Sequence, residues 1–101
     1  MNTTILEFEI PIADNSLITM PVYSDILKCI NKNDKIVLCV QTKQEYLDTG
    51  LTCSRYFSVY GTGTFFREDL YYIATVIMSD GFVWHVLEQT YTLHWNPNQD
   101  L

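Results

Sequence analysis

The 101-residue sequence predicts a single all-β domain, a mainly antiparallel sandwich or barrel of about seven short strands with at most one short helical turn. Apolar and polar residues alternate with a period of two in several segments, and turn-forming residues separate these segments. No segment has a convincing helical period, and there is no internal repeat. A chain of this length has room for one hydrophobic core, so residues 1–101 are expected to form one domain.

The N-terminal strands are indicated by alternation and by the turn between them. Residues 4–12 alternate apolar and polar side chains, and Pro11 favours a position at a sheet edge. Residues 14–16 are turn formers, and a second strand follows at 17–20, ended by Pro21.

The middle of the chain predicts a β-hairpin and a loop. Strands are expected at 25–30 and 35–42, because the polar cluster at 31–34 is typical of a hairpin turn. Residues 36–40 are apolar on both faces and are therefore expected to form a central strand of the core. Residues 44–53 have mixed polarity and predict a loop of about ten residues, long enough to be a functional edge.

The last third of the chain predicts three more strands. Residues 54–60 alternate again and end at a glycine-rich corner, 61–64, where positive φ angles permit a change of direction. Residues 67–69 are expected to form a single helical turn before a strand at 71–78. The Asp-Gly pair that follows favours a type I′ hairpin, and the returning strand is expected at 82–88, or at 82–95 if the alternation that continues beyond Glu88 belongs to it.

Composition excludes several functional classes. The net charge is −6, the acidic residues are scattered, and no basic stripe is present, so direct nucleic-acid binding is not expected. No apolar stretch approaches the length that spans a membrane. Cys29, Cys39 and Cys53 are odd in number and lack metal-site spacing, which predicts reduced thiols in a cytoplasm.

The glycine-rich corner is the first candidate ligand site. Its backbone N–H groups and hydroxyls suit a phosphate, nearby arginines supply positive charge, and tyrosines offer flat faces to a base. The alternatives are a structural corner and tyrosines that half-bury at a sheet surface or an interface. The corner lacks the lysine and the following helix of a P-loop, so an NTPase is not supported. The candidate ligand-binding residues are Arg55, Tyr56, Tyr60, Gly61, Thr62, Gly63, Thr64 and Arg67, with Tyr71 and Tyr72 as further stacking tyrosines.

Nothing in the sequence pairs a nucleophile with a base. His85 lies in mid-strand and is expected to be a structural histidine, because no close spacing links it to His94 or to a cysteine. No enzymatic activity, catalytic residue, metal or cofactor is therefore expected. The apolar residues near the C-terminus either fold back as an edge strand or pair with another subunit, and we expect a homo-oligomer interface that includes Tyr91, Leu93 and Trp95.

An ordered set of short motifs runs through residues 3–88: Met20-Pro21, Ile26-Leu27, Ile36-Val37-Leu38-Cys39-Val40, Tyr60-Gly61-Thr62-Gly63, Tyr72-Ile73-Ala74-Thr75-Val76 and Val83-Trp84-His85-Val86-Leu87-Glu88. Together they resemble a family of small uncharacterised bacteriophage and prophage proteins, classed as a domain of unknown function. Thr64 departs from that family, which usually has a histidine there, and residues 89–101 extend beyond its usual end. The resemblance implies a phage or prophage origin, a β-rich fold and a location in the host bacterial cytoplasm.

These observations predict a small phage-encoded binding protein without enzymatic activity. In one form it acts in counter-defence by sequestering a small anionic signalling nucleotide, in a pocket that includes the 61–64 corner. The alternatives are a protein-interaction inhibitor of a host enzyme, complex or defence protein, and a phage accessory or structural protein.

Overall fold

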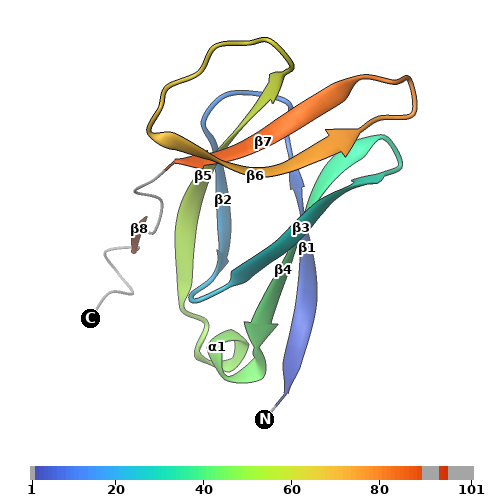
Figure 1. The fold of residues 1–101 in the computed structure, drawn as a ribbon. Helices are drawn as coiled ribbons and strands as arrows, with labels where there is room; N and C mark the ends of the chain where they lie inside the picture. Colours follow the sequence, from blue (N-terminus) through green and yellow to red (C-terminus); the bar gives the residue numbers. More distant parts are fainter. Residues whose placement is uncertain (1, 90–93, 96–101) are drawn as a thin grey trace.

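Two antiparallel β-sheets pack against each other in the computed structural model, which describes residues 2–89 and the backbone of residues 94–95 (Figure 1). The prediction of an all-β, mainly antiparallel sandwich of about seven strands is confirmed. The elements are β1 (Thr3–Ile10), β2 (Ser16–Pro21), β3 (Asp25–Lys32), β4 (Lys35–Lys43), α1 (Gln44–Thr49), β5 (Thr52–Gly61), β6 (Leu70–Ile77), β7 (Val83–Gln89) and β8 (His94–Trp95).

The smaller sheet has the strand order β1-β4-β3, so β4 is central as its apolar sequence predicts. Leu38 and Val40 belong to the core between the sheets, and both are 0% exposed. The β3–β4 hairpin closes through Asn33 and Asp34, which both have positive φ angles of 53° and 59°. Two such residues between paired strands form the type I′ turn, in which Asn and Asp are favoured.

The larger sheet has the order β2-β5-β7-β6, and β8 also pairs with β5. The ten-residue strand β5 joins its parts, because β2 pairs with its first half and β7 pairs with its second half. The core lies between this sheet and the smaller one, and Phe57, Val86 and Met20 are among its most buried residues.

The β6–β7 hairpin is confirmed, but its turn is not the predicted type I′. Of the turn residues only Gly81 has a positive φ angle, 91°. Its N–H donates to the carbonyl of Met78 at 3.0 Å, and the Asp80 carboxylate accepts from the N–H of Phe82 at 3.0 Å. The Asp80 side chain therefore holds a turn with one left-handed residue, a three-residue arrangement common in hairpins.

The prediction of a loop at 44–53 was wrong. The first six of these residues form the helix α1, and the last two begin β5. Gly50, at φ 71°, ends the helix with its N–H donating to the Leu47 carbonyl at 3.1 Å. Six residues are too few for a helical period to show in the sequence, which is why the pattern missed it. Residues 67–69 form a turn instead of the predicted helical turn, closed by the Leu70 N–H on the Arg67 carbonyl at 3.2 Å.

Polar contacts tie the two sheets together along one side. Ser79, in the β6–β7 turn, lies with its Oγ 2.5 and 2.7 Å from the two carboxylate oxygens of Asp34 in the β3–β4 turn. Asn31 Nδ2 also donates to the carbonyl of Ile77 at 3.2 Å. Within the described ranges, no helix is long and apolar enough to cross a membrane.

Candidate functional site

The loop between β5 and β6 folds over the outer face of the larger sheet. Alternation along the strands places Val59 and Val86 in the core, so their neighbours Tyr60 and His85 point away from it. Leu87 also lies on this outer face, yet it is only 2% exposed. Residues of the loop that follows Gly61 line a cavity together with Leu87.

This cavity has a volume of about 430 Å³, within the range of small-molecule sites. It is lined by residues of the loop and of the strands β5, β6 and β7. Figure 1 shows how this loop connects β5 to β6. The lining is Tyr60, Gly61, Thr62, Gly63, Thr64, Phe66, Leu70, Tyr72, His85 and Leu87.

A stacked aromatic pair forms one wall of the cavity. The rings of Tyr60 and Phe66 are 5.8 Å apart with an interplanar angle of 4°. Both residues also line a neighbouring cavity of about 450 Å³, together with Asp14 and Arg67. The pair therefore separates a neutral cavity from one that has charged groups at its edge.

A chain of hydrogen bonds joins the loop to the sheet below it. Thr62 Oγ1 lies 2.7 Å from His85 Nε2, His85 Nδ1 lies 2.9 Å from Thr75 Oγ1, and Thr75 Oγ1 lies 2.8 Å from Tyr72 Oη. Each hydroxyl can donate or accept, so the chain adapts to either tautomer of the histidine. These contacts to both ring nitrogens agree with the prediction of a structural histidine at His85. The sequence did not indicate its partners, because the cross-strand pairing of Thr75 with His85 appears only once the register of β6 and β7 is known.

The structure brings together some of the predicted ligand-binding residues and separates others. Tyr60 and the corner residues Gly61, Thr62, Gly63 and Thr64 all line the cavity. Arg67 lies at the neighbouring cavity, where its Nε is 3.2 Å from Asp69 Oδ1. Tyr56 is on the outer face but farther along β5, opposite Leu17.

Arg55 points to the other side of the sheet and forms a buried ion pair with Glu88. The Arg55 Nε and Nη2 atoms are 2.6 and 2.9 Å from the two carboxylate oxygens, and Glu88 is 0% exposed. Arg55 Nη1 donates to the Ser24 carbonyl at 3.0 Å, and Tyr71 Oη donates to Glu88 at 3.1 Å. Burial and the nearby Glu88 carboxylate raise the pKa of Tyr71 above its ordinary value. These contacts commit Arg55 to Glu88 and to the interior.

The lining of the cavity of about 430 Å³, which is called the main cavity from here on, favours a neutral planar group. Of the ten described residues that line it, none is Lys, Arg, Asp or Glu, and four have aromatic rings, counting the imidazole of His85. Among the residues that the structure describes, no group of three or more His, Cys, Asp or Glu side chains is arranged to hold a metal ion. The cysteines Cys29, Cys39 and Cys53 are buried free thiols away from this site, and burial raises the pKa of Cys29 to about 12.

One protein-family model matches most of this chain. A family model described as Domain of unknown function (DUF7352) matches residues 1–95, which include both cavities. The chain belongs to this family. No curated protein and no solved structure is significantly similar to this DUF7352 chain. The DUF7352 match runs past Glu88 and ends at Trp95.

The residues predicted to form an oligomer interface are described only in part. Tyr91 and Leu93 lie outside the described residues. Trp95 belongs to β8, where its backbone pairs with Cys53 of β5.

Proposed function

We propose that this DUF7352 protein is a non-enzymatic binding protein that holds a small planar ligand between the 62–69 loop and the outer face of the larger sheet. The observation that carries the proposal is the cavity of about 430 Å³, closed on one side by the stacked Tyr60 and Phe66 rings. Aromatic walls bind flat ligands by stacking, and a few polar groups then fix their orientation.

The ligand that fits this arrangement best is a nucleotide whose base enters the main cavity. The bases stack well on Phe and Tyr rings, and the hydroxyls of Thr62 and Tyr72 can donate or accept at a base edge. The neutral lining suits a base and offers no cation to a phosphate. Arg67 lines the neighbouring cavity beyond the stacked pair, and it is the cation that we propose for the phosphate.

The biological setting of the proposal is phage counter-defence in the host bacterial cytoplasm. A protein that binds a host signalling nucleotide without transforming it lowers the free concentration of that nucleotide by mass action. The motif resemblance to phage and prophage proteins supports this setting. A homo-oligomer that involves Tyr91, Leu93 and Trp95 is part of the same proposal, and light scattering of the protein in solution tests it.

Calorimetric titration with cyclic and linear nucleotides, and with their nucleosides, tests the ligand class. Phe66→Ala removes one ring of the stacked wall and should weaken binding by about tenfold or more, since stacking of a base on an aromatic ring contributes about 1–3 kcal/mol. The matched control is Phe82→Ala, which removes an aromatic ring that is 63% exposed and lies outside the cavity lining. Nucleosides should retain much of the affinity of the nucleotides, and Arg67→Gln should reduce only nucleotide binding.

Two results would contradict the proposal. If no nucleotide or nucleoside produces heat at any concentration tested, the ligand class is wrong. If Phe66→Ala and Phe82→Ala weaken binding equally, the assigned cavity is wrong.

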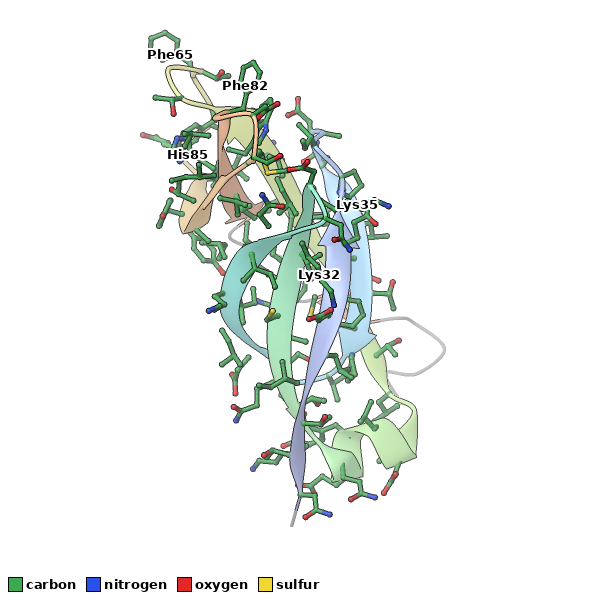
Figure 2. The ribbon with its side chains drawn as sticks, turned by 90° about the vertical axis from the view of Figure 1, so that its right-hand side faces the viewer. Lys32, Lys35, Phe65, Phe82 and His85 are labelled. Carbon is green, nitrogen blue, oxygen red and sulfur yellow. The ribbon has the colours of Figure 1, made fainter. Side chains whose placement is uncertain are left out.

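A protein partner is a second candidate, favoured by two exposed rings at one end of the molecule. Figure 2 shows Phe65 and Phe82 projecting from neighbouring loops at this end, and they are 98% and 63% exposed. Exposed aromatic residues of this kind are enriched in interfaces. A partner captured from host lysate by the wild type, lost by a Phe65→Ser/Phe82→Ser variant and kept by Phe66→Ala, would favour this function over ligand sequestration.

A further inference from the structure

The helix α1 and the 62–69 loop lie at opposite ends of the molecule (Figure 1). A separate cavity at the α1 end has Tyr46 of this helix in its lining. It has a volume of about 230 Å³ and lies where the turn before β3 meets the end of β4. We propose that this cavity binds a small zwitterion with an ammonium and a carboxylate group, the charge pattern of a free amino acid. The proposal is independent of the ligand in the 62–69 cavity, because the two cavities share no residue.

Tyr23 is presented to this cavity by a turn that is held on several sides. Its φ angle is 58°, in the left-handed region that bulky residues rarely adopt. Tyr23 is 57% exposed, whereas its neighbours Val22 and Ser24 are 1% and 7% exposed. Ser24 Oγ donates to the Pro21 carbonyl at 2.6 Å, and the half-buried Arg55 donates to the Ser24 carbonyl. Unfavourable backbone conformations that the surroundings hold in place cluster at binding sites.

The ring of Tyr23 meets a second tyrosine across the cavity edge. Tyr46, on α1, has its ring centroid 5.2 Å from that of Tyr23, with an interplanar angle of 53°. Two tilted tyrosine faces form a concave aromatic surface that contacts an apolar side chain well. The same faces attract an ammonium group through the negative potential of the rings.

The two charged residues of the lining complete a zwitterion site. Asp25 begins β3 and Lys43 ends β4, and the pairing of Asp25 with Gln41 places all three on the same face of the sheet. Within residues 2–89, neither Asp25 nor Lys43 makes an ion pair or a side-chain hydrogen bond. One negative and one positive group that face a cavity without neutralising each other match the two charges of an amino acid.

Thr42 also belongs to the lining, but its side chain does not face the ligand. It is 2% exposed and lies on the core face of β4 with Val40, opposite the face of Gln41 and Lys43. Its Oγ1, which has no hydrogen-bond partner among the described residues, is buried on that core face.

The test begins with a thermal-shift screen of the standard L-amino acids at about 10 mM, a concentration that detects weak binding. Calorimetry then compares the strongest amino acid with its decarboxylated amine and its deaminated acid. We expect the amino acid to bind at least about tenfold more tightly than either analogue, because each analogue loses one of the two charges.

Charge variants locate the site. Asp25→Asn and Lys43→Gln should each weaken binding by about tenfold. Glu9→Gln and Lys35→Gln make the same charge changes in an exposed ion pair on the outer face of the smaller sheet and should leave binding unchanged (Figure 2).

Three outcomes would overturn the proposal. The first is a screen in which no amino acid raises the melting temperature. The second is an amine or acid analogue that binds as tightly as the amino acid, since the site would then recognise only one charge. The third is equal weakening by the Asp25 and Glu9 variants, which would indicate a general effect of net charge.

Discussion

The two sheets place their ion pairs on opposite sides. The smaller sheet carries Lys32 with Glu7 and Lys35 with Glu9 on its outer face, where all four side chains are exposed (Figure 2). The larger sheet buries the pair of Arg55 and Glu88 on its inner face. The outer face of the larger sheet carries hydroxyl groups and aromatic rings beneath the 62–69 loop, and the main cavity lies there. The outer face of the smaller sheet is charged and solvated along these pairs, whereas the outer face of the larger sheet has a neutral cavity lining beneath the loop.

The largest effect is expected from the buried pair. Glu88→Gln leaves the guanidinium of Arg55 in the interior without a counter-charge, and this should lower the free energy of unfolding by about 3–5 kcal/mol. Urea denaturation measures the loss. The double variant Arg55→Met/Glu88→Leu removes both charges and should recover most of it. A Glu88→Gln protein as stable as the wild type would contradict the importance of the pair.

Tyr71 should contribute less than the ion pair to the free energy of unfolding, and its contribution should depend on pH. Tyr71→Phe removes the hydrogen bond to Glu88 and should cost about 1 kcal/mol at neutral pH. The pKa of Tyr71 is raised above its ordinary 10.0, so its contribution is complete below pH 10.0 and is lost as the pH rises through the folded value. The difference between wild type and variant should therefore shrink in alkaline urea titrations.

The thiol of Cys29, whose pKa is raised to about 12, also contributes to the loss of stability at alkaline pH. The difference between the wild type and Tyr71→Phe isolates the effect of Tyr71, because both proteins contain Cys29. A difference that stays constant to high pH would exclude the proposed role of the Tyr71 hydroxyl.

Asp34 should link the two hairpins in an acid-sensitive way. Hydrogen bonds from the side chain and then the backbone of Ser79 lower the pKa of Asp34 below its ordinary 3.8. Its stabilising contribution is therefore present above pH 3.8 and is lost as the pH falls through the lower folded value. Asp34→Asn keeps a residue that tolerates the left-handed turn but removes the charge. Urea midpoints measured at neutral pH and at about pH 3 should differ less in this variant than in the wild type.

The smallest effect is expected on the charged outer face. Lys32 Nζ lies 2.7 Å from Glu7 Oε1, but the two side chains are 54% and 44% exposed. Water and salt screen such a pair, so Lys32→Gln should barely change the urea midpoint, and about 1 M salt should remove any difference. If Lys32→Gln lowers the free energy of unfolding as much as Glu88→Gln does, the exposed pairs of the smaller sheet and the buried pair of the larger sheet would not differ in their contribution to stability.

Local sequence determined most of the fold. Alternation marked the strands, because one face of each sheet must be buried. The apolar run at 36–40 identified the central strand, since β4 is covered on both faces. The polar cluster at 31–34 identified a hairpin, because Asn33 and Asp34 accept positive φ angles at little cost. The helix α1 was missed, because six residues carry almost no periodic signal and tertiary contacts stabilise so short a helix.

The tertiary structure decided what the site contains. Sequence proximity grouped Arg55 with the 61–64 corner, but strand alternation and the approach of Glu88 from β7 turned Arg55 to the inner face. Phe66 and His85 entered the site because a loop folded back and two strands paired in one register. The sequence by itself determined which residues alternate and where the chain turns, because those choices depend on neighbours a few positions away. Which side chains meet depends on sheet register and loop closure, and these are fixed only when the whole core packs.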